Sequence, residues 1–398
     1  MKENNSQQTT FLMLQKLNSD EFQQHNPAPH CPNPRCRNFN HEDIHDTSWR
    51  RDHGFYYTKA FGWVPRYRCT RCGKTFSNQT FLIDYYVKKP ISYIELLKPL
   101  LSTSGQGNIT RFSNVRYELI QNRYERLSRM MLSLHAELRK QIIPDEDFVL
   151  DGFESFSKSQ YFPNNINIMV GSESELIYGM GFSQLRRKGK MTEKQKKRRA
   201  ELEALYGKAP PKAVELSVAS LIEDLAKLLH SNNLSGKKLK TDEHKAYVRA
   251  FKRAKSASDC LEHVQYSSKD ARTRNNPLFP VNYCDRQIRK DQVNHVRETV
   301  QFAQCPSAMM TRLSLYQMFH NYIMPRRVKK QRKGDWSTRG EFMGLSREKF
   351  FNILKSIIGR RTFFHKSEFW EEEKMTWMMA WRNKGIELGR RRPLHILL

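Results

Sequence analysis

The sequence has no run of about eighteen consecutive apolar residues, the minimum for a membrane-spanning helix. The segment from Met1 to Gln8 is polar and lacks the apolar centre of a secretory signal. Cysteine is sparse, and we interpret the isolated Cys260, Cys284 and Cys305 as buried thiols in a reducing compartment. These absences predict a cytoplasmic protein without a membrane segment.

Acidic side chains are also scarce, because 41 Asp and Glu accompany 69 Lys and Arg in 398 residues, a formal net charge of +28. Surface charge can serve solubility alone. Here the basic residues recur in clusters along the whole chain, and each neutralised phosphate of a polyanion releases counterions. The charge therefore favours nucleic acid as the partner.

Four of the seven cysteines form two pairs, Cys31 with Cys36 and Cys69 with Cys72. Two such pairs supply four thiolates to one tetrahedral ion, which predicts a closed structural zinc site rather than a catalytic one. Disulfides are the weaker alternative, because nothing indicates secretion. Aromatic residues between the pairs predict short strands around the metal. They are Trp49, Phe55, Tyr56, Tyr57, Phe61, Trp63 and Tyr67.

Composition divides the chain into segments of different character. We predict a flexible arm over 1–25, a zinc ribbon over 26–85, a helical segment over 90–143, a catalytic domain over 147–325 with a basic helical insertion at 183–238, and a basic, aromatic helical tail over 329–398. The helical segment combines a turn at 104–108 with an Arg-rich helix. This pattern fits a helix-turn-helix and fits an interdomain linker equally well.

From residue 148 the apolar pattern predicts strands at 148–156, 167–170 and 176–182, and then a helical insertion. A fourth strand begins at 239 and ends at Asp242, where a helix follows, and a fifth covers 260–266. Three strands, a helix and then alternating strands and helices are the order of an RNase H-like α/β fold, a mixed sheet with flanking helices.

Two of these strands carry acids in matching contexts, Asp151 and Asp242. If the strands are neighbours, the carboxylates lie side by side, which is costly unless a cation bridges them. A pair of Mg²⁺ or Mn²⁺ ions held by such acids is what phosphoryl transfer uses. A single strand-end aspartate is usually a turn or cap residue. The matching contexts favour a metal site.

The run NPLFPVNYCDRQIRKD from Asn276 to Asp291, with the run from Asn294 to Phe302, resembles the catalytic block of bacterial insertion sequence transposases. These enzymes of mobile elements carry three acids of the DDE or DDD type on an RNase H-like core. The preceding ribbon and helical segment resemble their N-terminal half. The resemblance covers about residues 26–328 and implies DNA transposition and recombination by a nucleoid-associated bacterial enzyme.

The resemblance places the first two acids on Asp151 and Asp242, and leaves three candidates for the third. Asp285 is closest to the start of the helix after the fifth strand, and Asp291 and Glu298 are the alternatives. Glu298 lies about 20 Å beyond Asp285 along a continuous helix, so the two cannot serve one site. The family usually has Glu there, but position favours Asp285, which we choose.

Eleven basic residues are candidates for contact with DNA phosphates, although any one of them can be an ordinary solvated charge. They are Arg111, Arg116 and Arg123 in the helical segment, Arg186, Arg187, Lys188 and Lys190 in the insertion, and Arg286, Arg289, Lys290 and Arg297 around the third acid.

The leading hypothesis is therefore a transposase that binds element ends, cleaves double-stranded DNA and joins the ends to a target. Because two ends must be brought together, we expect a homodimer or a higher assembly. The alternatives are a non-catalytic zinc-ribbon regulator and a structure-specific nuclease on the same core.

Overall fold

The computed structural model describes residues 28–380 apart from 42, 44, 90, 92, 102–103, 297–300, 328–333 and 358–360. The predicted arm over 1–25 lies outside these residues. No helix in the described part of the chain is long and apolar enough to cross a membrane.

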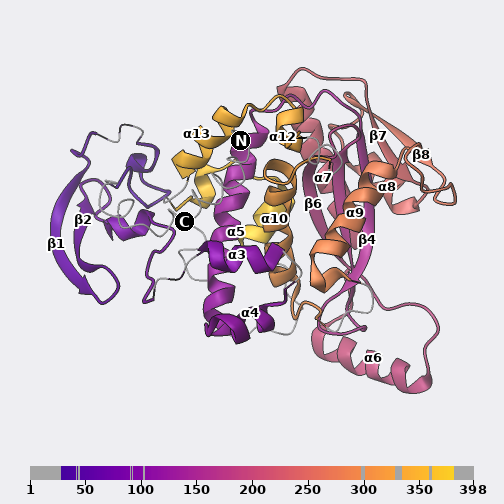
Figure 1. Cartoon of the computed structure of the whole chain (residues 1–398), viewed down its shortest axis with the longest axis horizontal. Coiled ribbons are helices and arrows are strands. Elements are labelled where there is room, and N and C mark those ends of the chain that lie inside the picture. The colour runs from indigo at the N-terminus through magenta and orange to yellow at the C-terminus, as the bar shows by residue number, and fades with distance from the viewer. Residues whose placement is uncertain are drawn as a thin grey trace.

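The first sheet has three antiparallel strands in chain order and lies at one end of the molecule (Figure 1). Its strands are β1 (Arg50–Thr58), β2 (Gly62–Cys69) and β3 (Thr75–Ser77). The short helices η2 (Arg37–Asn40) and η3 (Asn78–Phe81) flank them. Trp49 stacks on Phe76 with ring centroids 5.4 Å apart, which fills a small core beside the cysteines.

The second sheet is mixed and has the order β6-β5-β4-β7-β8. Its strands are β4 (Phe148–Phe156), β5 (Pro163–Gly171), β6 (Ile177–Gln184), β7 (Lys237–Asp242) and β8 (Leu261–Tyr266). β5 is antiparallel to β4 and β6, whereas β7 is parallel to β4 and β8. β5 and β6 are buried almost throughout, as expected of strands covered on both faces.

The helices form three groups along the chain. Before the second sheet come α3 (Tyr93–Leu101), α4 (Gln106–Ser113) and α5 (Tyr117–Arg139). Within and after it come α6 (Glu193–Tyr206), α7 (Ala213–Ser231), α8 (Lys245–Arg253), α9 (Phe279–Asp291), η4 (Val293–His295) and α10 (Pro306–Tyr322). The last group is α12 (Arg339–Phe342), α13 (Arg347–Ile357), η5 (Phe364–Lys366) and α14 (Glu371–Trp377).

Helix α5 lies at the centre of the molecule rather than on its surface (Figure 1). It packs against α10, α13 and α14, and one hydrophobic cluster runs from α3 and α5 through the second sheet to α13. The segment expected to be a turn at 104–108 instead begins the short helix α4. The hydrophobic core therefore continues past residue 143, the predicted end of the helical segment, into the second sheet.

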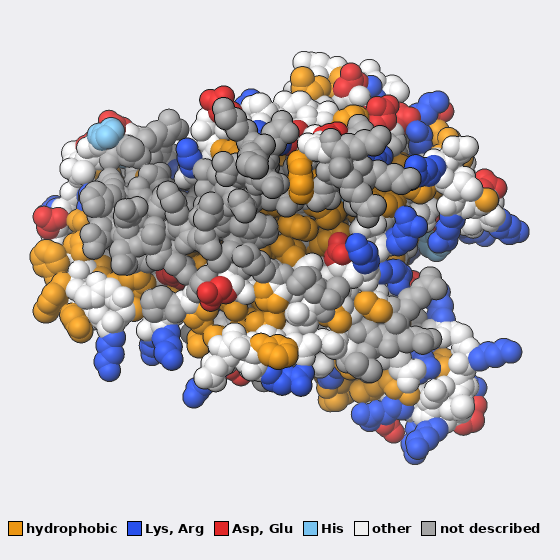
Figure 2. All heavy atoms as spheres, viewed as in Figure 1, with side chains coloured by type: hydrophobic (Ala, Val, Ile, Leu, Met, Phe, Trp, Pro, Cys, Tyr) orange, Lys and Arg blue, Asp and Glu red, His pale blue; other side chains and the backbone are white. Residues whose placement is uncertain are grey.

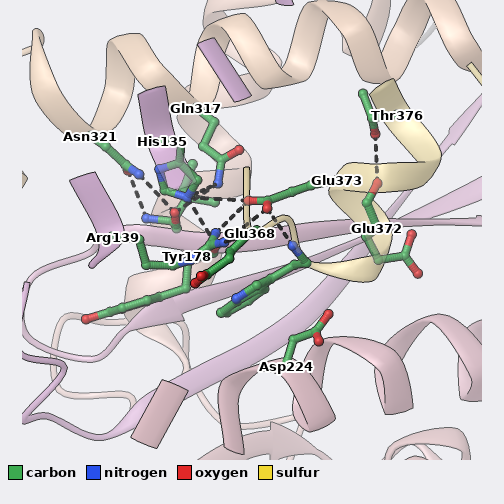
Figure 3. Close-up of polar contacts among 12 residues, drawn as sticks. His135, Arg139, Tyr178, Asp224, Gln317, Asn321, Glu368, Glu372, Glu373 and Thr376 are labelled. Carbon is green, nitrogen blue, oxygen red and sulfur yellow. Dashed lines mark hydrogen bonds and ion pairs between the residues drawn. The ribbon is translucent and has the colours of Figure 1, made fainter. Parts of the chain in front are cut away.

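The C-terminal segment joins both parts of the molecule. Phe363 belongs to the core of the first sheet, where its ring lies 5.1 Å from that of His30. Further on, Glu373 of α14 accepts hydrogen bonds of 2.6 and 3.1 Å from Arg139 of α5 (Figure 3). Trp370 packs closely on Gly179 of β6, where an added Cβ would lie 2.6 Å from its ring.

Candidate active site

The register between β4 and β7 relates Asp151, which lies within β4, to Asp242 at the end of β7. These parallel strands pair Phe148 with Leu239 and Val149 with Lys240. The same offset, carried two residues further, sets Asp151 beside Asp242. Neighbouring strands lie about 4.8 Å apart, and residues in equal register point to the same face. The two aspartates are therefore expected on the same face of the sheet, and the charge of Asp242 acts on Asp151.

Asp151 is partly buried near the middle of β4. Its Oδ1 atom accepts hydrogen bonds from the backbone N–H of Gly152 at 2.7 Å and from the Tyr247 hydroxyl at 3.2 Å. Burial, with the charge of Asp242 adding to it, raises the pKa of Asp151 to about 6, against the opposing effects of these two hydrogen bonds and of Arg272. A bound cation would stabilise the charge of this carboxylate.

Asp242 ends β7 and starts the turn into α8. Its Oδ1 atom accepts from the backbone N–H of His244 at 2.9 Å, and the His244 ring in turn caps α8. The aspartate therefore performs the turn role that a single strand-end Asp usually has. Its Oδ2 atom, like that of Asp151, has no hydrogen-bond partner in the described part of the chain, which leaves one oxygen of each acid for a ligand.

Asp285 approaches from α9, which packs against β4 and β5. Its Oδ1 atom is buried and has no hydrogen-bond partner among the described residues. Burial raises the pKa of Asp285 well above its ordinary value, and the charge of Asp151 raises it further, while Arg289 and Arg272 act in the opposite direction. An orphaned buried carboxylate oxygen beside a second acid fits a missing cation.

Tyr247 of α8 is related to all three acids, because the charge of each one changes the pKa of its hydroxyl. Burial raises the pKa of this phenol well above its ordinary value, and the charges of Asp151, Asp242 and Asp285 add to the shift. Sequence reasoning missed Tyr247 although it lies five residues after Asp242. Its position one helical turn after the His244 cap was the available signal.

The other two candidates for the third acid have different positions. Asp291 lies at the end of α9, where its Oδ2 atom accepts from the Tyr316 hydroxyl at 3.3 Å. Burial raises its pKa, but neither Asp151 nor Asp242 contributes to the shift. Glu298 and Arg297 lie outside the described residues. The charge of Asp151 therefore acts on Asp285 and not on Asp291.

A groove with a volume of about 1020 Å³ is lined in part by Arg272, whose charge also acts on Asp151 and Asp285, although none of the three acids lines the groove itself. Arg272 and Arg274 from the loop before α9, Arg286 from α9 and Lys240 from β7 contribute positive side chains to its lining. Asp147 lies on the same wall and pairs with Lys240 at 2.9 Å. Arg272 and Arg274 were not singled out from the sequence, although the two arginines directly precede the recognised block.

The candidate DNA contacts of the insertion and of α9 lie at or near the surface. Lys188 and Lys190 are exposed, Arg186 is paired with Glu203 at 2.7 Å, and the guanidinium of Arg187 lies 4.7 Å from the Tyr161 ring centroid. Figure 2 shows Lys and Arg side chains gathered around α6.

On α9, Arg286 and Lys290 are exposed. Arg289 donates to the backbone carbonyl of Glu154 at 3.2 Å, which holds α9 against β4.

The helical segment behaves differently. Arg111 and Arg116 are exposed at α4 and at the start of α5. Arg123 is only 2% exposed and donates to the Lys89 carbonyl at 2.8 Å, with Asp84 at 3.9 Å. A guanidinium enclosed in this way offers no surface to DNA, so Arg123 has a structural position. Arginine spacing along a helix could not distinguish the two cases.

The four cysteines converge, as their spacing predicts. Cys31, Cys36, Cys69 and Cys72 place their sulfur atoms all within 4.8 Å of one another. The Cys31–Cys72 and Cys36–Cys69 sulfur distances are 3.5 and 3.9 Å. Four thiolates bonded to one tetrahedral zinc ion at about 2.3 Å lie about 3.8 Å apart. These residues can therefore hold zinc.

The local backbone explains this convergence. Gly73 has φ of +71° and its N–H donates to the Cys69 carbonyl at 3.0 Å, which closes the tight turn of the second pair. The Asn38 amide donates to the Cys69 sulfur at 3.4 Å, an outer contact that orients this ligand. Among the described residues, no other group of three or more ligand atoms lies this close together, so the three acids are more widely spaced than the cysteines.

Comparison with known proteins adds little to this geometry. No protein-family model matches the chain, and no curated protein matches it. Solved structures that match include two of Ciona intestinalis endonuclease V in complex with inosine-containing DNA, each 12% identical with a TM-score of 0.15. They cover 54% and 53% of this chain, and 97% and 95% of theirs. At this TM-score the matches support no conclusion about the chain.

Proposed function

We propose that the protein is a DNA transposase that binds the ends of a mobile element, cleaves them and transfers the strands to target DNA. The observation that carries the proposal is the equal register of Asp151 and Asp242 on neighbouring parallel strands, with Asp285 facing them from α9. The order β6-β5-β4-β7-β8, with only β5 antiparallel to its neighbours, supports an RNase H-like core.

The acids would hold Mg²⁺ or Mn²⁺, and the donor chemistry fits. Such ions prefer carboxylate oxygens together with oxygens of the substrate phosphate. When bound, they supply a polarised nucleophile and neutralise charge on the leaving oxygen. Asp151 and Asp242 provide two adjacent carboxylates with unoccupied Oδ2 atoms, and Asp285 provides an orphaned one.

The chain's own groups position the site and the substrate. Gly152 and Tyr247 fix the Asp151 carboxylate through two hydrogen bonds, so its second oxygen points to a defined place. An added Cβ at Gly152 would lie 2.3 Å from the Asn165 amide, which leaves no room for a side chain. Arg272, Arg274 and Arg286 line the groove, where they can bind DNA phosphates.

The zinc site and the basic insertion extend the proposed DNA surface away from the acids. α6 has no buried residue and projects from the body of the molecule (Figure 1). An exposed basic helix of this kind gives affinity that depends on salt and not on sequence. Synapsis of two element ends requires at least two copies of the chain, and we propose a homodimer on DNA.

The test uses a supercoiled plasmid that carries the genomic DNA flanking the chain's own gene, incubated with Mg²⁺. A transposase releases or nicks the element ends and yields strand-joined products in a second plasmid. A structure-specific nuclease on the same core would cleave and never join. Binding without any metal-dependent cleavage would contradict both and favour a DNA-binding regulator.

A further inference from the structure

Strands β1 and β2 expose three large aromatic side chains that the zinc site does not use. Phe55, Tyr57 and Trp63 are 67%, 63% and 71% exposed. The sequence predicted that the aromatic run surrounds the metal, and Trp49 does pack beside it. The three exposed rings do not, and a contiguous exposed apolar patch usually marks a binding surface.

The three rings lie together on one face of the β1–β2 hairpin. The register pairs Tyr57 with Trp63 and Phe55 with Pro65, and residues two apart on a strand share a face. The rings of Tyr57 and Trp63 meet edge to face, with centroids 5.6 Å apart. Figure 2 shows hydrophobic side chains on the surface at the end of the molecule that Figure 1 labels β1. We name this surface, formed by Phe55, Tyr57, Trp63 and Pro65, the aromatic face.

The hairpin that carries the aromatic face, with the segment after it, is rich in basic residues. Residues 50–76 contain seven Lys and Arg and a single acid, Asp52. At the inner end, the guanidinium of Arg50 lies 3.9 Å from the ring centroid of Tyr67. At the other end Lys59 is exposed in the hairpin turn. A partner must therefore combine flat apolar groups with negative charge.

We propose that the aromatic face binds unpaired DNA, with nucleobases stacked on Phe55, Tyr57 and Trp63 and phosphates beside Lys59 and Arg50. Every base has a π-face, so such stacking tolerates any sequence. In duplex DNA those faces are covered by the neighbouring bases, which makes the site selective for single strands. This inference takes from the proposed function only that the chain binds DNA.

A second copy of the chain fits this surface less well. Two copies of the same hairpin would bring together two sets of positive charge with one acid each, and like charges across an interface are costly. An unpaired strand supplies the opposite charge at every nucleotide. Unpaired DNA would be present next to a cleaved element end, which gives the site a place beside the proposed chemistry.

Fluorescence anisotropy of a labelled dT oligonucleotide of about 12 nucleotides tests the proposal, with a blunt duplex of equal length as the comparison. Titrations without added magnesium exclude cleavage and therefore report binding alone. Their result does not depend on whether the chain is a transposase. Trp63→Ala and Tyr57→Ala should each weaken oligonucleotide binding by about fivefold or more, and leave duplex binding and the salt slope unchanged. Tyr86→Ala, at an equally exposed tyrosine off the hairpin, should change neither.

Zinc content of each variant shows whether the fold is intact. Lys59→Gln should reduce the salt slope by about one without removing the preference for single strands. If the triple variant of Phe55, Tyr57 and Trp63 retains zinc and binds the oligonucleotide like the unaltered chain, the proposal is wrong. Sedimentation gives a second outcome that would overturn the proposal. If a dimer dissociates in that variant while oligonucleotide binding is intact, the aromatic face is a dimer interface.

Discussion

Asp151 and Asp242 lie on neighbouring parallel strands, each two residues beyond the paired Val149 and Lys240. Two carboxylates in this relation repel each other, and the raised pKa of Asp151, first from burial and then from the charge of Asp242, reflects that cost. In our proposal the fold retains this pair because the two acids hold a cation. The positions of the two acids also limit the proposed third metal ligand to side chains that reach the same edge of the sheet.

Asp285→Asn should abolish metal-dependent DNA cleavage, with a loss greater than the roughly hundredfold that outer partners of a metal cost. Asp291→Asn is the matched control on the same helix and should retain cleavage, because its carboxylate bonds to Tyr316 instead. Plasmid cleavage by both variants in Mg²⁺ gives the comparison. If Asp291→Asn lost cleavage and Asp285→Asn retained it, the third metal ligand would be Asp291 and not Asp285.

Cys36→Ser should remove zinc and unfold the three-stranded sheet, because a structural zinc site contributes folding energy directly. Cys305→Ser is the control, since Cys305 caps α10 away from the cysteine cluster and serine caps a helix well. Zinc content and the tryptophan fluorescence of the Trp49–Phe76 stack report the two outcomes. If the Cys36→Ser variant bound as much zinc as the unaltered chain, the proposed zinc site would be wrong.

Ionisation of the Glu372 carboxyl group should make the protein less stable as the pH rises. Burial, with the charges of Asp224 and Glu371 adding to it, raises the pKa of Glu372 from 4.5 to about 8 in the folded chain. The folded state therefore holds the proton more tightly, and the free energy of unfolding falls between pH 4.5 and about 8. Urea unfolding at pH 5 and pH 8 should show a smaller fall in Glu372→Gln. An equal fall in both proteins would contradict this assignment.

Arg139→Ala should destabilise the chain by about 3–5 kcal/mol, because it leaves the buried Glu373 carboxylate without its partner. Replacement of both residues, Arg139→Met with Glu373→Leu, should recover most of that loss. Arg186→Ala, which breaks the exposed pair with Glu203, should change stability little. Thermal unfolding of the three variants provides the measurement, and equal effects at the buried and exposed pairs would be inconsistent with the packing of α14.

The sequence predicted several strands of the second sheet well, because strand periodicity is a local signal. The strands β4 and β8 and the end of β7 at Asp242 fall where the pattern placed them, within a residue. The cysteine spacing likewise predicted the cluster that can hold zinc.

Features that depend on distant packing were not predictable in this way. Phe363 completes the core around the first sheet from more than 280 residues beyond Phe81, and no local pattern links the two. Arg123 has the spacing of a DNA contact but pairs with Asp84 inside the protein. Burial of a long cationic side chain is decided by what packs over it, which one sequence does not show.

The most direct measurement is Mn²⁺ binding by electron paramagnetic resonance to the unaltered chain, to Asp151→Asn and to Asp242→Asn. Asp147→Asn is the control, since Asp147 lies four residues before Asp151, about 13 Å along the strand direction, and pairs with Lys240. We predict that Asp151→Asn and Asp242→Asn each lose the bound Mn²⁺ while Asp147→Asn keeps it. Mn²⁺ binding that is unchanged in both strand-end variants would contradict the proposed metal site.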